Sequence, residues 1–183
     1  MHQQHRFGYA ETDNVKLLEM PYLGNALSMV VALPMQRGGL AAVERTLSAE
    51  RFASWRKALQ RTEKVQVALP KWEFSDECSL SEMLAEMGMP SAFRSGEADF
   101  SGMTDAERLY ISSILHKAYI AVDEEGTEAA AATAVMAAGT AYRPEEPKTF
   151  RADHPFVFAI VHRTTGEILF LGRVVNPAAG RGK

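Results

Sequence analysis

The stretch EEGTEAAAATAV, residues 124–135, decides how the rest of the chain is interpreted. It follows an apolar run at 119–122 and precedes a polar segment with two prolines that extends from 139 to 149. Alanine has the highest intrinsic helix propensity, so the tract taken alone predicts a helix. Small residues occupy all of its faces, however, and such a segment can be laid between two existing strands without steric conflict. We therefore expect a strand that can enter a sheet, with a buried helix as the less favoured alternative.

One face of such a strand is free of charge. Side chains alternate across a strand, so residues that share a face are two positions apart. The set that would face the core together with Thr127 contains only small or apolar residues: Ala129, Ala131, Thr133, Val135 and Ala137. Glu128 would lie on the solvent face, and Gly126 permits a backbone hinge where a branched residue would resist it. The pattern is compatible with the burial of one face of a new strand.

Residues 124–135 resemble the proximal hinge of the reactive-centre loop of the serpins, and several other segments of the chain resemble the same family. Further segments resemble serpin sequences in the same order along the chain: 18–34 as a core hairpin, ADFSGM at 98–103, LYISSILHKA at 109–118, and two terminal strands at 154–160 and 170–177. Together they cover nearly all 183 residues, but only the C-terminal half of a typical serpin.

The resemblance implies an α+β serpin fold, with multiple mostly antiparallel β-sheets and helices. Residues 1–183 would be the C-terminal portion of a single serpin domain, with the reactive-centre loop and its hinge at 123–149. The missing N-terminal half would then be a partner, because an inserting strand needs two neighbours. Either the chain is part of a longer polypeptide, or the isolated chain is inactive.

The function implied by the resemblance is inhibition of a serine-type endopeptidase. The inhibitor acts as a suicide substrate: its loop is cleaved, and the loop then inserts into the main β-sheet. A non-inhibitory serpin acting as a carrier or chaperone, and a cross-class inhibitor of cysteine proteases, are the alternatives. We expect no enzyme, because the sequence has no Gly-x-Ser-x-Gly elbow, no dinucleotide fingerprint and no Cys/His spacing for zinc. No metal and no cofactor is expected.

Family spacing also implies a reactive bond. It places the bait residue sixteen positions after Glu124, which gives the bond Thr140–Ala141. A small, β-branched residue suits an elastase-like or subtilisin-like protease. Tyr142–Arg143 is the second choice and would point to a chymotrypsin-like target. The hinge residues by resemblance are Glu124, Gly126, Thr127, Ala129, Ala131 and Thr133.

Two further residues take a role from the resemblance. Lys71 would pair with Glu124 near the site where the loop enters the sheet, or the two would form a solvent-exposed pair of little energetic weight. His116 would belong to a buried polar network behind the central sheet, in line with the general tendency of a histidine in an apolar strand.

Composition narrows the function classes. Hydrophobic residues make up 46% of the chain and charged residues 23%, as in soluble globular domains. The net charge of −3 implies no affinity for nucleic acid or an anionic membrane. A single cysteine, Cys78, excludes an internal disulfide. The N-terminus shows no signal peptide, and the compartment stays unknown, although the resemblance implies an extracellular location for a full-length parent.

Local patterns predict the elements. Residues 27–33 form an apolar run that fits a strand buried on both faces. Ser48 is expected to cap a helix, and Ser79 with Glu82 predicts a capping box for a helix at 79–87 that stops at Gly88. Residues 109–122 predict one long strand, and the runs at 156–162 and 168–175 predict a hairpin.

Overall fold

The structure is a computed structural model that describes residues 2–12, 14–104, 106–123 and 147–178. The chain divides into two compact units. The first contains the residues up to Trp72 and those from Val122 onward, and the second contains Glu73–Ala121. Each unit is described by itself below.

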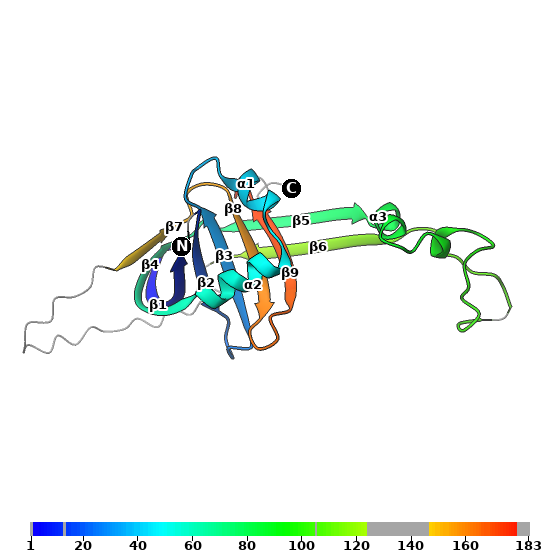
Figure 1. The fold of residues 1–183 in the computed structure, drawn as a ribbon, viewed down its shortest axis with the longest axis horizontal. Helices are drawn as coiled ribbons and strands as arrows, with labels where there is room; N and C mark the ends of the chain where they lie inside the picture. Colours follow the sequence, from blue (N-terminus) through cyan, green and yellow to red (C-terminus); the bar gives the residue numbers. More distant parts are fainter. Residues whose placement is uncertain (1, 13, 105, 124–146, 179–183) are drawn as a thin grey trace, which may run out of the picture. The chain divides into compact units, whose positions relative to one another are not determined.

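A seven-stranded sheet forms the first unit, in the order β7-β4-β1-β2-β3-β8-β9 (Figure 1). Its strands are β1 (His2–Glu11), β2 (Val15–Pro21), β3 (Leu27–Pro34), β4 (Gln60–Ala68), β7 (Lys148–Arg151), β8 (Phe156–His162) and β9 (Ile168–Val174). Neighbours are antiparallel except β4 and β7, which are parallel. The predicted fold class, a mostly antiparallel α+β fold, is confirmed.

Strand β3 lies in the interior of this sheet, and seven of its eight residues are buried. Its alternate side chains therefore enter two different cores. Val30 and Ala32 pack on the side covered by α1 (Leu40–Arg45) and α2 (Ala49–Ala58), with Phe52 and Trp55 of α2. Burying a large apolar side chain contributes about 1.5–3 kcal/mol. The prediction of a strand buried on both faces is confirmed.

The opposite side of the sheet carries an aromatic cluster. The ring of Trp72 lies 5.5 Å from that of Phe156 and 5.6 Å from that of Phe158, and the indole is 1% exposed. Tilted and edge-to-face contacts at such distances add to the energy of burial. The cluster fixes Trp72, which follows β4 in the first unit, against β8.

Local signals were correct at the turns and at one helix start. The turn after β2 has positive φ at Gly24 and Asn25, the two residues that tolerate it best. The side chain of Ser48 accepts a hydrogen bond from the backbone N–H of Arg51 and so caps α2.

The second unit contains β5 (Trp72–Ser79), β6 (Leu115–Val122), α3 (Ser81–Glu86) and the short 3-10 helix η1 (Ser91–Phe93). Strands β5 and β6 pair with each other and run in opposite directions (Figure 1). The prediction of one strand over 109–122 was wrong, because β6 begins only at Leu115. Before it, the backbone N–H of Ile111 donates to Ala92 and that of Ile114 to the hydroxyl of Ser81, instead of to a neighbouring strand.

The capping box predicted for α3 was also wrong. The helix begins at Ser81, its cap residue is Leu80, and no side chain caps it. The hydroxyl of Ser81 accepts from Ile114, so a tertiary contact occupies the group nearest to the helix start. Gly88 has a φ of +113°, and it stops the helix as predicted.

Gly172 on β9 provides a test of packing between β8 and β9. It faces Phe158 across the ladder, and a Cβ at this position would lie 2.7 Å from Cζ of that ring. We expect Gly172→Ala to lower the free energy of unfolding by about 1–3 kcal/mol, the usual cost of overpacking. Thermal unfolding monitored by circular dichroism measures this. Gly38→Ala is the matched control, since nothing lies within 4 Å of its Cβ position; equal melting temperatures for the two variants would contradict the packing argument.

Candidate functional site

The candidate site is the connection between β6 and β7. Residues 124–146 of this connection lie outside the described residues. The predicted hinge and bond residues are therefore not placed by the structure: Glu124, Gly126, Thr127, Ala129, Ala131, Thr133, Thr140, Ala141, Tyr142 and Arg143. What the structure describes is how the chain enters this connection from β6 and how it leaves into β7.

The entry strand, β6, is exposed along much of its length. Leu115 and Tyr119 are exposed, and half-buried residues alternate with exposed ones from Ala118 to Val122. The phenol of Tyr119 donates a 3.0 Å hydrogen bond to Glu73 of β5, and this bond raises the pKa of the phenol. Nζ of Lys117 lies 3.5 Å from Oε2 of Glu77, which is also on β5. These polar contacts tie β6 to β5.

The polar network predicted for His116 would include the missing N-terminal half, so its place in that network stays a prediction. The residue is exposed near the start of β6, before the side chains on its face of the strand become half-buried at Ala118. Lys71 is half-buried and has interactions of its own. Its predicted partner Glu124 lies outside the described residues, so that pairing stays a prediction.

The exit strand, β7, is firmly anchored. It was expected to begin after 149 but already begins at Lys148, and Phe150 at its centre is fully buried. Its register with β4 pairs Phe150 with Val67, which is also buried. Beyond the strand, the backbone N–H of Ala152 donates to the carbonyl of Ala68 at 2.8 Å.

A polar cluster continues this anchor. His154 contacts two acceptors: its Nδ1 lies 2.8 Å from Oδ1 of Asp153, and its Nε2 lies 2.7 Å from the carbonyl oxygen of Pro34. A protonated imidazole donates to both. Arg37 donates to the other carboxylate oxygen of Asp153 at 2.8 Å. The bond from His154, together with the charges of His154, Arg37 and Arg151, lowers the pKa of Asp153.

Sequence reasoning missed this cluster. Its members are far apart in the chain, at 34–37 and 151–154, and only the pairing of β3 with β8 brings them together. The one available signal was an acid–histidine pair, Asp153-His154, placed directly before a proline and a buried strand. The cluster matters because it fixes the chain a few residues beyond the connection.

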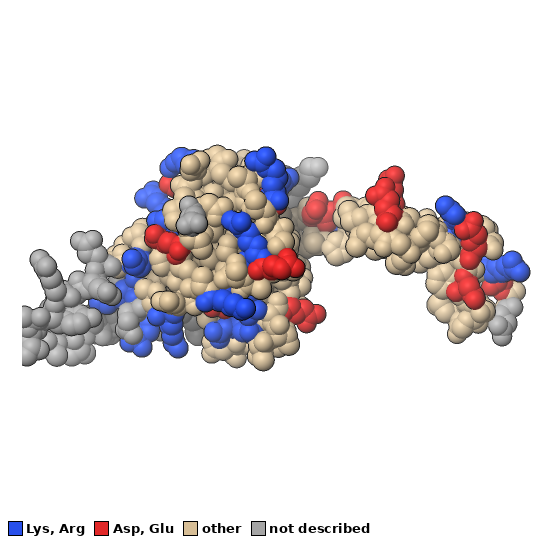
Figure 2. All heavy atoms as spheres, in the orientation of Figure 1, with Lys and Arg blue, Asp and Glu red and all other residues tan. Residues whose placement is uncertain are grey.

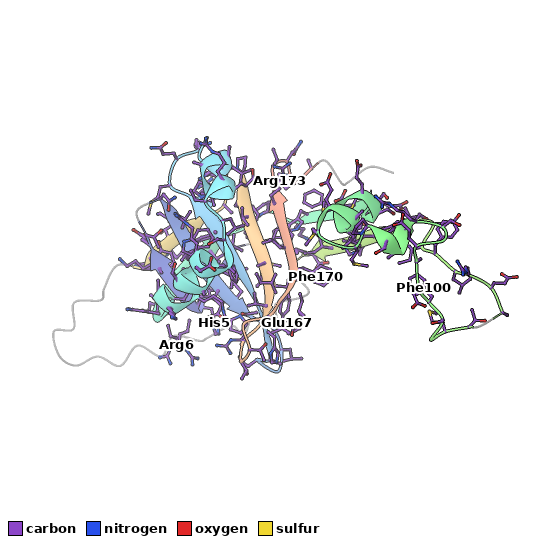
Figure 3. All side chains as sticks on the ribbon, turned by 45° about the vertical axis from the view of Figure 1, so that its right-hand side comes forward. His5, Arg6, Phe100, Glu167, Phe170 and Arg173 are labelled. Carbon is purple, nitrogen blue, oxygen red and sulfur yellow. The ribbon has the colours of Figure 1, made fainter. Side chains whose placement is uncertain are left out.

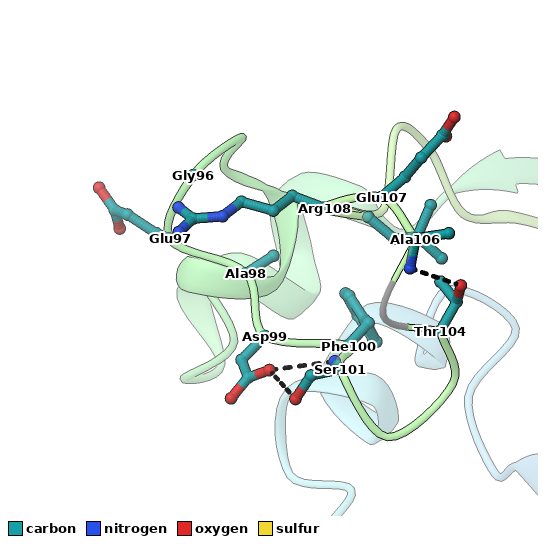
Figure 4. Close-up of a pocket in the computed structure, with 11 residues that line it drawn as sticks. Gly96, Glu97, Ala98, Asp99, Phe100, Ser101, Thr104, Ala106, Glu107 and Arg108 are labelled. Atoms are coloured by element: carbon teal, nitrogen blue, oxygen red, sulfur yellow. Dashed lines mark hydrogen bonds between the residues drawn. The ribbon is translucent and has the colours of Figure 1, made fainter.

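The described chain also has surface hollows. One of about 500 Å³ lies beside the polar cluster, between Pro70, Phe156 and Val174. The other, of about 470 Å³, is formed by the loop at 96–109 in the second unit (Figure 4). There Asp99 accepts hydrogen bonds from the backbone and hydroxyl of Ser101, which lowers its pKa. This is a self-contained turn.

No metal centre can be built from the part of the chain that the structure describes. Among these residues no three His, Cys, Asp or Glu side chains are grouped closely enough to hold an ion. Cys78 is exposed on β5. The described helices include none with the length and apolar character needed to cross a membrane.

Comparison with known proteins gives a consistent answer. Residues 1–177 match the family described as serpin (serine protease inhibitor). An uncharacterized serpin-like protein of Thermococcus kodakarensis is 46% identical over 181 residues, covering 98% of this chain and 42% of that protein. The leukocyte elastase inhibitor of Homo sapiens is 43% identical over 185 residues, covering 97% of this chain and 48% of that protein.

Solved structures agree. The native state of tengpin, a thermophilic serpin, superposes with a TM-score of 0.76 at 34% identity, covering 96% of this chain and 45% of that one. The structure of uncleaved ovalbumin superposes with a TM-score of 0.78 at 32% identity, covering 97% of this chain and 44% of that one. The chain thus spans about half the length of the relatives it matches.

The lowered pKa of Asp153 makes a prediction about acid stability. A carboxylate whose pKa is lower in the folded state stabilises the fold above its unfolded pKa, and this contribution is lost as the pH falls through the folded value. We expect Asp153→Asn to lower the melting temperature at about pH 6, and we expect this effect to decrease progressively as the pH falls below the ordinary aspartate pKa of about 3.9. Asp76→Asn, at an exposed position on β5, is the control. A pH-independent effect of Asp153→Asn would contradict the role of its charge.

Proposed function

The chain belongs to the serpin family, and we propose that it carries the reactive loop of an inhibitor of serine-type endopeptidases. The observation that carries the proposal is the uncharged face from Thr127 to Ala137, in the connection between β6 and β7. The relatives named as leukocyte elastase inhibitors support the same class of target.

The proposed mechanism uses the loop as a suicide substrate. A protease attacks the bait bond and forms an acyl-enzyme, and the part of the loop before the bond then enters the sheet beside β6. Strand addition of this kind is a general mode of recognition in which backbone hydrogen bonds supply the affinity. The inhibitor provides a bait bond and stored conformational free energy, and the protease provides the catalytic groups.

The anchoring of β7 supports this division of the loop. Phe150 and the contacts of Asp153 with Arg37 and His154 hold the chain after the loop. After cleavage, the part beyond the bond therefore stays with β7, and only the part attached to β6 is free to change its place. The covalently attached protease moves with that second part.

A second partner, in the proposal, is the rest of the serpin domain. Strand β9 is an edge strand of the seven-stranded sheet. It exposes four consecutive apolar residues, Ile168 to Leu171, and Phe170 projects from it (Figure 3). Consecutive residues of a strand point to opposite faces, so both faces of β9 are apolar and accessible. Long exposed edges of this kind favour aggregation unless they are covered. The N-terminal half that the relatives have would cover β9 and would supply a second neighbour for the inserting strand.

Covalent trapping tests the proposal and separates it from a carrier or chaperone role. The full-length protein is incubated with elastase-type, subtilisin-type and chymotrypsin-type proteases, and with a papain-type enzyme for the cross-class alternative. We expect a complex with a serine protease that survives SDS and heat. If every enzyme yields only cleaved product, the protein is a substrate or a non-inhibitory serpin and the inhibitor proposal fails.

The uncharged face predicts the effect of an inward charge. We expect Thr133→Arg to convert the inhibitor into a substrate, since an unpaired charge buried in the sheet costs several kcal/mol, against about 0.5–1.5 kcal/mol gained from each backbone hydrogen bond. Thr127→Arg should act at the first step of insertion. Ala132→Arg is the matched control, because it places the same charge on the solvent face. The stoichiometry of inhibition measures all three, and full trapping by both Thr variants would overturn the insertion argument.

The cleavage position is a separate prediction. We expect the protease to cut between Thr140 and Ala141, so that the released C-terminal peptide begins at Ala141. Mass spectrometry of the denatured complex determines its mass. A peptide that begins at Arg143 would instead assign the bait to Tyr142 and indicate a chymotrypsin-like target.

A further inference from the structure

One face of the first unit carries a group of basic side chains, and all of them except Arg151 lie outside the roles described above. Helix α2 and the start of β4 form a short basic segment: residues 51–64 contain five Lys and Arg. Figure 2 shows blue side chains gathered around α2 and over the adjacent strands β1 and β4. The pairing of the strands determines which of these side chains lie on the same surface.

The strand register places several of these basic side chains on the helix side of the sheet. Leu17 lies in the core on the helix side of the sheet, and its cross-strand partner Ala10 packs against the same core. Directly paired residues point to the same face, and alternate residues of one strand do so too. Gly8 and Arg6 of the regular strand β1 therefore face the helix side, as does Arg61, the partner of Gly8 on β4.

The same face continues across β4 to β7. The β-bulge opposite Arg6 adds one residue to β4, and Lys64 returns to the helix side next to the buried Val65. Ala68 pairs with Arg151 on that face, whereas Phe150 points to the opposite core. We call the exposed set Arg6, Arg61, Lys64 and Arg151, with Lys57 in the last turn of α2, the basic strip.

The carboxylates described beside the strip are already bonded. Glu19 accepts from the hydroxyl of Ser28 at 2.8 Å and lies 3.4 Å from Arg163. Asp153 lies 3.8 Å from Arg151 but is held at 2.8 Å by both Arg37 and His154. Neither of these groups is free to neutralise Arg61 or Lys64.

The position of the strip indicates its partner. Arg151 ends β7, the strand into which the reactive connection leads, and Thr140 precedes Lys148 by eight residues. Eight extended residues reach at most about 29 Å, whereas a protease of about 220 residues has a radius of gyration of about 17 Å. A protease bound at the bait bond is therefore wide enough, at about twice that radius, to extend from the bond to β7 and the strip.

We propose that the basic strip is a secondary docking surface for the target protease, and that it fits a protease with an acidic surface beside the active-site cleft. The inference rests on the proposed function. A long polyanionic polysaccharide is the other ligand of suitable charge. The strip ends at Arg151, on the strand into which the reactive connection leads, so the flank of a protease bound at the bait bond fits better.

Association kinetics test the proposal. The probe is the protease that forms the SDS-stable complex, and the rate constant is measured with full-length protein at about 0.1 M and 1 M salt, where the Debye length is about 10 and 3 Å. We expect the double variant Arg61→Glu/Lys64→Glu to associate about tenfold more slowly at low salt, since steering typically contributes factors of about 10–1,000. The difference should shrink at high salt, with the stoichiometry of inhibition unchanged. Arg45→Glu, at an exposed position on α1, should change the rate less than about twofold.

The outcomes separate this proposal from the previous one. Equal rates, faster association of the double variant, or a loss that is the same at both salt concentrations would overturn the docking surface. Reduced retention on a heparin column with unchanged protease kinetics would assign the strip to a polysaccharide and would also overturn it. If the loop is cleaved without trapping, the inhibitor proposal fails, and the same comparison is made on kcat/KM for cleavage, where the strip should still act.

Discussion

The burial of β3 on both faces is the constraint on which the first unit depends. A strand whose alternate side chains enter two cores can occupy only one register, because a shift by one residue would exchange the two sets of side chains. This register sets the pairing with β2 and β8, and the pairing with β8 in turn brings the 34–37 loop to Asp153 and His154. The anchor of the reactive connection is thus a consequence of where β3 lies.

This dependence makes the two ends of the connection unequal. On the β7 side, a fully buried Phe150, a ladder with β4 and a charged cluster hold the chain. On the β6 side, the strand exposes Leu115 and Tyr119 and is tied to β5 by side-chain contacts at its surface. On the described chain, β7 is held by buried contacts and β6 by its pairing with β5 and by surface contacts. This difference supports the proposed insertion of the part of the connection that is attached to β6.

Sequence patterns predicted those parts of the fold in which local chemistry and tertiary packing agree. The doubly buried β3, the Ser48 cap and the β8–β9 hairpin were all predicted correctly. The failures lie where a tertiary contact overrides a local signal: Ser81 and Ala92 bond the backbone that precedes β6, so that strand begins at Leu115. The Asp153 cluster depends on residues more than 100 positions apart, which no local pattern can join.

Charge is the property that whole-chain composition describes least well here. A net charge of −3 implied no affinity for nucleic acid or an anionic membrane, and it does not show how the charge is distributed: residues 51–64 hold five Lys and Arg, whereas 73–121 hold nine Asp and Glu against three Lys and Arg. Electrostatic attraction acts over about a Debye length, so a partner responds to the local surface and not to the sum. The strip lies on strands that the proposed insertion leaves in place, and the inserting residues 127–137 present no charge on their inward face. In the two proposals, encounter and trapping depend on separate residues, so a change at Arg61 or Lys64 would alter the choice of protease without altering the hinge sequence.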